Sequence, residues 1–434
     1  MIAAHPVAPI GAHELLVLLM QLGLLLGLAL VLGRLATALR MPAVVGELAA
    51  GVLVGPSLLA HLAPGLSAWL VPHEPVQQHL LDAVGLLGVL LLVGITGMHI
   101  DLDLVRRKGV TAAWVSTGGL LVPLGAGIGL GFLLPTAVAG TGRPVFAMFL
   151  GVAMCVSAIP VISKILLEMR LLHRNIGQLI VSAAAVDDIA GWLMLSIVSA
   201  MATNGLRAGQ VGWSVASLAG VVVLAAVIGR TAVRTTLRLA ARSADPGVRT
   251  ATAVVLLLLL AAGTHALGME PILGAFLGGI LISASGMVDR EWLAPLRTIV
   301  MAVLAPIFFA TAGLRVDLTA LARPAVLLSA VAALLVAIVG KFVGAYVGAR
   351  ASRLSHWEAI ALGAGLNARG VIEVIVAMVG LRLGILGTEA YTIIVLIAVV
   401  TSLMAPPILR FAVGRITVTA EEHERERVFT GVGT

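Results

Sequence analysis

The sequence of 434 residues is poor in charged side chains, in aromatic side chains and in cysteine. Charged residues make up 11% of the chain and aromatic residues 4%, and Cys155 is its one cysteine. A soluble protein carries roughly 25% charged residues, so this chain lacks the charge needed to cover a globular surface in water. Soluble enzymes, nucleic-acid-binding proteins and secreted disulfide scaffolds are therefore excluded, and Cys155 can form no intramolecular disulfide.

Hydrophobic residues make up 60% of the chain, and its mean hydropathy is +1.11. These values are typical of an integral membrane protein. The N-terminal stretch has no Lys or Arg before Arg34, so it lacks the basic start of a cleavable signal peptide. The first hydrophobic segment is therefore expected to remain as a membrane helix.

Hydrophobic segments divide the chain into thirteen predicted spans. A spanning helix needs about 20 apolar residues, and fewer where it is broken or sheltered by protein. Charges, proline and glycine mark the ends of the segments, which predicts an all-α polytopic membrane domain over residues 1–413 and a short tail, 414–434. The spans are 14–39, 42–60, 80–98, 110–135, 144–166, 176–202, 212–238, 249–267, 271–285, 296–314, 324–350, 356–380 and 389–413.

Basic residues are distributed unequally between the two sides of this arrangement. Alternate connections carry 21 Lys and Arg residues on one side and five on the other. One mistaken span would move every later loop across the membrane and remove the bias. Because cytoplasmic loops are rich in Lys and Arg, we expect a plasma-membrane protein with its N-terminus outside and its C-terminus in the cytoplasm. The excess of basic residues behind the formal charge of +7 thus reflects the orientation of the chain in the membrane. No nucleic-acid partner is expected.

Two short motifs recur seven spans apart. Gly46–Leu53 (GELAAGVL) is similar to Gly274–Leu281 (GAFLGGIL), and Gly97–Leu102 (GMHIDL) is similar to Gly313–Leu318 (GLRVDL). Each match alone is weak, since glycine motifs are common in membrane helices. Chance similarity in an apolar alphabet is the alternative interpretation.

An odd offset of seven spans brings the two copies into the membrane in opposite directions. Inverted repeats are typical of secondary transporters, whose ion site lies near the bilayer midplane where the repeats meet. We therefore expect two inverted repeats, at about 14–202 and 249–413, joined by a linker helix at 212–238.

A few charged residues fall deep inside the predicted spans, away from the loops and the span ends. A charge at the bilayer centre costs about 2.5–3.5 kcal/mol, so such residues persist where they are paired, hydrated or needed for function. They are Glu47, Asp187, Asp188, Lys341, Arg369 and Glu373.

Asp187 and Asp188 lie side by side in a helical run with no other charge. Adjacent residues on a helix point about 100° apart, so one carboxylate can face a cation partner while the other faces a hydrated cavity. Two acids in a poorly hydrated place do not easily ionise together, and one of them can hold either a proton or a monovalent cation. That competition is the chemistry of a proton-coupled exchanger. A purely structural acid pair is the alternative.

Lys341 lies in the middle of an otherwise neutral span. A lone membrane lysine most often neutralises a buried acid, and Asp187 or Asp188 is the obvious partner. Two interpretations stay open for Lys341. It forms a structural ion pair that never titrates, or it loses its proton when the cation arrives.

Two spans contain signs of a break in the helix. Pro160 interrupts the fifth span, and Leu366–Gly370, which contains Asn367 and Arg369, interrupts the twelfth. Broken helices at corresponding repeat positions indicate a transport site, and their dipole ends could be compensated by Arg369 and Glu373. We interpret these two residues, like Glu47, as mainly structural.

Long signatures in this chain resemble the monovalent cation:proton antiporter-2 family, and most of all its plant and fungal cation/proton exchangers and their bacterial relatives. The resembling segments are Ser157–Trp192, Asn367–Ala377, Gly46–Pro56 and Ala305–Leu314, within a similarity over about 20–410. The resemblance implies the sodium/proton antiporter fold, with thirteen helices, crossed broken helices and elevator-like alternating access. It also implies a homodimer in which each protomer has a dimerisation domain and a moving core domain.

The resemblance also implies roles for individual residues. Asp188 would be the main cation and proton carrier, Asp187 its partner acid, and Lys341 the counter-ion of Asp187. Ser157, with carbonyl groups of the break, would be a cation ligand, while Pro160, Asn367, Arg369 and Glu373 would support the broken helices.

The chain departs from the family pattern at two places. Many related exchangers have Asn at the position of Asp187, and potassium-efflux members have Gln there. Asp187 favours a second titrating carboxylate, leaves electrogenic exchange open and weakens the transfer of potassium selectivity. Many relatives also carry a cytoplasmic nucleotide-binding domain, for which tail 414–434 is too short, so nucleotide gating is not expected.

The sequence therefore predicts a secondary antiporter that exchanges Na⁺ or K⁺ for protons and serves pH homeostasis. No residues resemble a channel's selectivity filter, and the ten His have no paired metal-ligand spacing, so neither an enzyme nor a cofactor is expected. A cation- or pH-sensing membrane protein of the same fold, without net transport, is the alternative.

Overall fold

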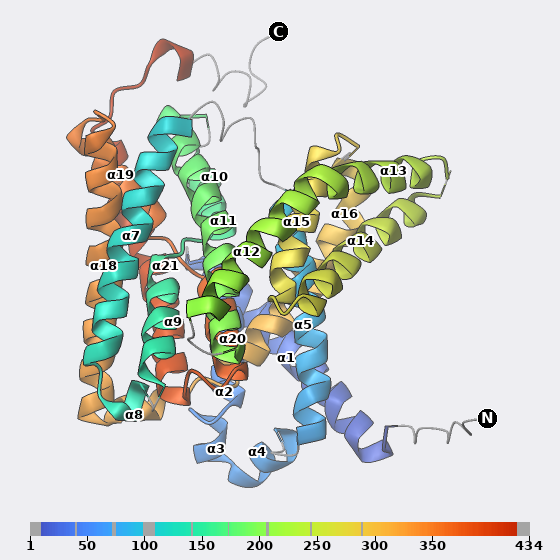
Figure 1. The fold of residues 1–434 in the computed structure, drawn as a ribbon. Coiled ribbons are helices and arrows are strands. Elements are labelled where there is room, and N and C mark those ends of the chain that lie inside the picture. The colour runs from blue at the N-terminus through green and yellow to red at the C-terminus, as the bar shows by residue number, and fades with distance from the viewer. Residues whose placement is uncertain are drawn as a thin grey trace.

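The computed structural model describes residues 10–39, 41–71, 75–98, 109–139, 142–171, 173–204, 208–243, 245–287 and 290–422. Within these ranges the chain forms helices joined by turns, and no strand occurs among them. Figure 1 shows the helices running side by side, most of them in one general direction. This all-α architecture confirms the predicted fold class.

Each of the thirteen predicted spans coincides with a helix or with consecutive helices. Ten stretches of the described residues are long and apolar enough to cross a membrane, and eleven if the bent pair α19–α20 counts as one span. Two further helices, α9 and α15, are apolar but shorter. The longer elements are α1 (Ala12–Ala38), α2 (Ala43–Val54), α5 (Pro75–Met98), α7 (Gly109–Leu133), α9 (Arg143–Cys155), α10 (Ile159–Glu168), α11 (Asn175–Asn204), α12 (Ala208–Leu224), α13 (Arg230–Ala240), α14 (Pro246–Ala266), α15 (Pro271–Ala284), α16 (Arg290–Ile299), α17 (Ala305–Gly313), α18 (Pro324–Ala351), α19 (His356–Leu366), α20 (Val371–Arg382) and α21 (Thr388–Val413).

Shorter elements account for most differences from the predicted boundaries. The second span was predicted over 42–60, but α2 ends at Val54, and α3 (Leu59–Leu62) and α4 (Pro64–Leu70) follow it. Gly55 and Pro56 explain this end, because proline disfavours the helical conformation of the residue before it. Short π-helical turns, Ala225–Gly229 and Val300–Leu304, connect α12 to α13 and α16 to α17.

The helices form two groups. The core group consists of α7, α9, α10, α11, α18, α19, α20 and α21, and its most extensive packing is between α7 and α18. The scaffold group consists of α1, α2, α5, α14, α15, α16 and α17, with α5 against α15 and α2 against α17. In Figure 1, α18, α19 and α7 lie on the left and α14, α16 and α5 on the right.

Glycines of the two similar motifs, Gly46–Leu53 and Gly274–Leu281, make corresponding close contacts in the scaffold group. A Cβ at Gly46 would collide with the backbone of α1, and a Cβ at Gly274 would collide with that of α14. Gly51 lies equally close to α17, while Gly279 lies close to α5. Small residues let membrane helices approach closely, and here two three-helix units use them in the same way. Residues 99–102 of the other motif lie outside the described residues.

After α21 the chain folds back onto the first residues of α11. Arg174 Nε lies 3.2 Å from Glu422 Oε1, and the same oxygen accepts a hydrogen bond of 2.6 Å from the backbone amide of Asn175. The backbone amide of Thr419 donates to the other Glu422 oxygen at 2.7 Å. A carboxylate is favoured at a helix N-terminus, so Glu422 caps the helix that carries both aspartates. Residues 423–434 of the predicted tail lie outside the described residues.

Candidate ion site

The two broken helices meet at one place, which we name the crossing. It consists of Val156–Ala158, between α9 and α10, and Asn367–Gly370, between α19 and α20. Ser157 Oγ, in the first break, lies 2.9 Å from the carbonyl oxygen of Leu366 at the start of the second, so the two breaks are in contact. The breaks therefore occur where the sequence predicted them. α19 and α20 are bent by 44° relative to each other.

Glycine is required at the end of the second break. Gly370 has a φ of +152°, a conformation that other residues rarely adopt. A Cβ there would also lie 2.9 Å from the side chain of Val161. The chain can therefore turn into α20 while remaining close to α10.

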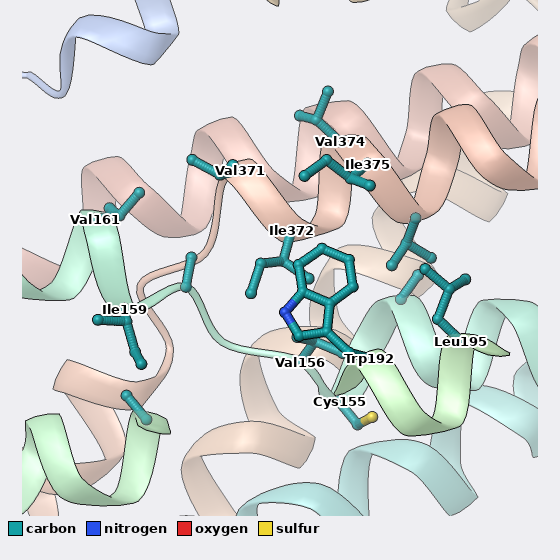
Figure 2. Close-up of a cluster of buried hydrophobic side chains, with 14 of the residues drawn as sticks. Cys155, Val156, Ile159, Val161, Trp192, Leu195, Val371, Ile372, Val374 and Ile375 are labelled. Carbon is teal, nitrogen blue, oxygen red and sulfur yellow. The ribbon is translucent and has the colours of Figure 1, made fainter. Parts of the chain in front are cut away.

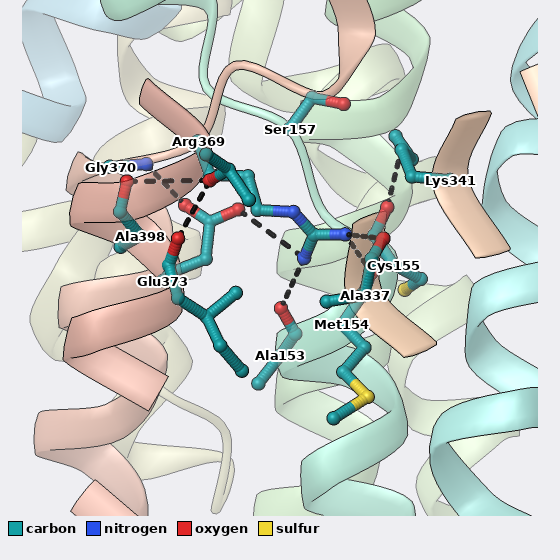
Figure 3. Close-up of polar contacts among 12 residues, drawn as sticks. Ala153, Met154, Cys155, Ser157, Ala337, Lys341, Arg369, Gly370, Glu373 and Ala398 are labelled. Carbon is teal, nitrogen blue, oxygen red and sulfur yellow. Dashed lines mark hydrogen bonds and ion pairs between the residues drawn. The ribbon is translucent and has the colours of Figure 1, made fainter. Parts of the chain in front are cut away.

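Arg369 and Lys341 neutralise the C-terminal end of α9. The Arg369 guanidinium donates to the carbonyl oxygens of Ala153, at 3.0 Å, and Met154, and Lys341 Nζ donates to that of Cys155 at 2.6 Å. Figure 3 shows these contacts gathered below the crossing. The last carbonyl groups of a helix have no partner within it and carry a partial negative charge, so two cations stabilise this half-helix end.

Glu373 lies in the first turn of α20, at the N-terminal end of a half-helix. Its Oε2 accepts a hydrogen bond of 2.7 Å from the backbone amide of Gly370, at the N-terminus of α20. Its Oε1 lies 4.0 Å from Arg369 Nη1. Both side chains are fully buried. Arg369 and Glu373 thus balance each other's charge while each contacts one of the broken helices.

Asp187 accepts hydrogen bonds from three side chains that belong to three different parts of the fold. Lys341 Nζ, on α18, lies 2.5 Å from Asp187 Oδ2, and the Ser157 hydroxyl in the crossing donates to the same oxygen at 2.7 Å. The hydroxyl of Ser116, on α7, donates to Oδ1. Lys341 and Asp187 are fully buried, so this carboxylate is desolvated and fully occupied by donors.

Asp188 has the opposite environment, although it is the next residue along α11. Its side chain is also fully buried. Neither of its oxygens has a hydrogen-bond partner among the residues that the structure describes. The backbone amide of Ile159, the first residue of α10, is close enough to act on it electrostatically. A buried carboxylate without partners is costly, so this group requires a proton or a cation.

The remaining predicted residues are placed as follows. Asn367 is buried in the crossing, and both polar atoms of its amide lack a partner among the described residues. Pro160 is the second residue of α10, where a proline is tolerated because its missing amide hydrogen has no acceptor there, but its side chain lies outside the described part. Glu47 lies on α2 in the scaffold group, half-buried and next to Gly33 of α1.

Sequence reasoning missed Ser116. Its hydroxyl is buried and bonds the Asp187 carboxylate across the packing of α7 on α11. Hydroxyl side chains are common in membrane helices, where they usually bond a carbonyl of their own helix. A serine in an apolar span therefore gives no signal that would separate a partner of the acid pair from an ordinary helix residue.

An apolar layer surrounds the crossing. Trp192, one turn after Asp188, packs with Val156 and Ile372 from the two broken helices (Figure 2). Its ring centroid lies 6.0 Å from that of Phe276 on α15, which extends the layer to the scaffold group. The layer keeps the dielectric constant low around the charges, which strengthens each ion pair and raises the cost of an unpaired charge.

Two cavities lie between the core and scaffold groups, towards opposite ends of the helices. The larger, of about 560 Å³, is lined by residues of α5, α15, α17 and α20, including Asp82, Arg315 and Arg382. The smaller, of about 350 Å³, is lined by α10 and α21 residues and by the end of α1, with Lys164 and Arg410. Asp188 lines neither cavity, so both cavities stop short of it in this conformation.

Comparison with known proteins identifies the group to which this arrangement belongs. The family model described as "sodium/hydrogen exchanger, transmembrane" matches residues 24–414. The Na(+)/H(+) antiporter NhaS4 of Synechocystis is 31% identical over 407 residues, covering 92% of this chain and 97% of that protein. The Cation/H(+) antiporter 20 of Arabidopsis thaliana is 30% identical over 409 residues, or 90% of this chain. This chain spans about half (48%) of the plant protein.

A solved structure shows the same fold. The sodium proton antiporter MjNhaP1 from Methanocaldococcus jannaschii superposes with a TM-score of 0.68 at 16% identity, covering 92% of this chain and 99% of that one. At this identity the likeness concerns the fold alone, and it agrees with the resemblance found in the sequence. The chain is a multi-pass membrane protein, and it belongs to the transmembrane sodium/hydrogen exchanger family.

Proposed function

We propose that this protein exchanges a monovalent cation, Na⁺ or K⁺, for protons, and that Asp188 carries both in turn. The observation that carries the proposal is the contrast between two adjacent buried carboxylates. Asp187 is occupied by three donors, whereas Asp188 has none among the described residues. A desolvated carboxylate without fixed partners is neutralised by whatever positive ion reaches it. A proton and a cation therefore compete for the same two oxygens.

The crossing supplies further ligands for a dehydrated cation. Ser157 and the unpartnered amide oxygen of Asn367 are the oxygen donors that we assign to the cation beside Asp188. Oxygen ligands suit a hard cation. Lys341 remains the counter-ion of Asp187, and Arg369 and Glu373 hold the broken helices, so each fixed charge at the crossing has a partner.

The protein is further proposed to work as a homodimer in the plasma membrane, with its N-terminus outside. The loop bias of 21 to five basic residues supports this orientation. We assign the moving part to the core group, which contains the crossing, and the static part to the scaffold group. The cavities of about 560 and 350 Å³ between the groups then give access from the two sides in alternation.

The test is proton movement in proteoliposomes that contain a pH-sensitive dye and an imposed pH difference. Sodium, potassium and lithium are added in turn, and we expect saturable proton release with at least one of them. Asp188→Asn should abolish this exchange and leave folding intact, because an amide cannot bind a transferable proton. Asp245→Asn is the matched control, since Asp245 is an exposed N-cap of α14 where asparagine serves equally well.

Two results would contradict the proposal. Normal cation-dependent proton movement in Asp188→Asn would remove Asp188 from the carrier role. Saturable cation binding to the wild-type protein without proton movement, measured by calorimetry, would favour the sensing function instead.

A further inference from the structure

The larger of the two cavities lies on the side of the fold that the proposed orientation places outside the membrane. Arg315 and Arg382 line it, and both belong to the five basic residues of that side. We name it the outer cavity. Its volume of about 560 Å³ leaves room for several water molecules, so an ion can reach its inner end in hydrated form. The residues between that inner end and Asp188 therefore decide when Asp188 is in contact with the outside.

Two apolar residues, one from each helix group, close the inner end of the outer cavity. Ile272 of α15 and Ile375 of α20 line the cavity. Phe276 lies one helical turn further along α15, and Ile372 lies one turn back along α20. Both directions lead away from the outer ends of these helices, so Phe276 and Ile372 lie deeper in the protein. Both side chains are almost completely buried, and the cavity does not continue between them.

Trp192 lies between these two residues and Asp188. It follows Asp188 by four residues on α11 and therefore shares its face of the helix. Helical side chains lean towards the N-terminus of their helix, so the indole ring covers the turn that carries Asp188. The ring centroid lies 6.0 Å from that of Phe276, and Figure 2 shows the ring beside Ile372. One indole ring thus closes the route from the outer cavity to Asp188.

No polar contact holds this ring in place within the described part of the chain. The indole N–H of Trp192 is buried and has no hydrogen-bond partner there. A buried indole N–H usually has a partner, and a buried donor without one is unfavourable. Water in the outer cavity would supply the missing partner if the ring moved towards it. The closed position therefore depends on apolar packing, which a movement of the helices can break.

The contact between Trp192 and Phe276 joins the two helix groups. Trp192 belongs to α11 of the core group, and Phe276 belongs to α15 of the scaffold group. Val156 and Ile372, the other neighbours of the ring, lie in the core group and move together with it. Of the contacts that close the route, the one with Phe276 is therefore the one that changes when the core group moves along the scaffold group.

We propose that Trp192 is the outer gate of the ion site. While its ring packs on Phe276, Asp188 is closed to the outer cavity. When the core group moves and the two rings separate, Asp188 opens to this cavity and exchanges its proton or its cation with the outside. The inference rests on the proposed role of Asp188 as the carrier. Trp192 binds neither ion and acts by covering or uncovering Asp188, so it is a positioning residue.

The experiment measures how fast position 188 is reached from each side of the membrane. Asp188→Cys places a thiol at the site, and a charged, membrane-impermeant methanethiosulfonate is added to right-side-out or inside-out vesicles. Cys155 is the one native cysteine and is buried, so the protein without the substitution gives the background. Adding Trp192→Ala should raise the labelling rate from the outside about tenfold. The rate from the inside should not change, because only the outer closure is removed.

Further variants separate a gate from a general loosening of the site. Phe276→Ala removes the scaffold half of the contact and should also raise the outside rate, which tests the proposal even if Trp192→Ala does not fold. Trp192→Phe keeps an aromatic ring and should keep the slow outside rate. Phe309→Ala is the matched control, because Phe309 is similarly buried but packs on Phe308 of its own helix, α17. It should change neither rate.

Three results would overturn the inference. They are an outside rate that Trp192→Ala leaves unchanged, an equal increase from both sides, and an increase from the inside alone. Labelling requires no transport, so these results are distinct from failure of the proposed function. That failure would appear as the absence of cation-dependent proton movement in the protein with Asp188 intact.

Discussion

Replacing Lys341 with alanine should lower the free energy of unfolding by about 3 kcal/mol. Lys341 and Asp187 are fully buried and lie 2.5 Å apart, and removing one partner of a buried ion pair costs about 3–5 kcal/mol because the other charge is left uncompensated. Ser116 and Ser157 still donate to Asp187 in the variant, so the lower end of that range applies. This corresponds to a change of about 150-fold in the unfolding equilibrium.

The measurement is denaturant-induced unfolding of the purified protein in detergent micelles, followed by tryptophan fluorescence. Lys341→Ala combined with Asp187→Asn should recover most of the loss, because the double variant buries no unpaired charge. It should also still exchange cations for protons, since Asp188 is unchanged. Arg234→Ala, at an exposed position of α13, is the control. Lys341→Ala as stable as this control would refute the reasoning.

Two ion pairs outside the crossing lead to further predictions. Arg382, on α20, lies 2.7 Å from Glu270 at the start of α15 and so joins the core group to the scaffold group. Because this pair must break when the groups move, Glu270→Gln should raise the exchange rate by up to about fivefold. Arg323→Gln is the control, because it breaks an ion pair within the core group and should leave the rate unchanged. Equal exchange rates in the two variants would show that the Arg382–Glu270 pair does not restrain the movement. Burial acts to raise the pKa of Glu422, but hydrogen bonds from backbone amides and from Arg174 outweigh it and hold the pKa below its usual value. The stabilisation by Glu422 is therefore full at neutral pH and is lost as the pH falls through this lowered pKa. Amide hydrogen exchange of residues 414–422 should be slow from pH 8 to 6 in the wild type and fast in Glu422→Gln. Fast exchange of these residues at pH 6 in the wild type would show that the Glu422 contacts do not hold them against α11.

The thirteen helical segments and both breaks could be predicted from the sequence because each has a local cause. Spans follow from runs of apolar residues, and their ends follow from charges, proline and glycine. The short helix α15, Pro271–Ala284, was found in the same way, although its length alone would not suggest a span. The π-helical turns at 225–229 and 300–304 have no such local signal.

Which aspartate is the paired one could not be derived from local sequence. A helix fixes the angle of about 100° between adjacent side chains, but the rotation of α11 about its own axis is set by its packing against α7, α9 and α19. That rotation turns Asp187 towards Lys341 and leaves Asp188 without a partner among the described residues. The resemblance to known exchangers suggested this assignment, whereas the residue pattern alone left both aspartates open. Ser116 was missed for the same reason, since its role depends on which face of α7 meets α11.

The charged groups at the crossing differ in their partners, and this difference comes from packing rather than from the count of acids. In the sequence, two adjacent aspartates and a lysine are equivalent to one another in kind, since each is a single charge in an apolar span. In the folded protein one aspartate and the lysine are fully buried, bonded to each other and fixed by two hydroxyls and a carbonyl. Opening them would expose two unpaired charges to an apolar layer, where each costs several kcal/mol. Under the proposed function, Asp188 avoids this cost because one positive partner replaces another, and this is why we assign the exchange to Asp188 rather than to the buried pair.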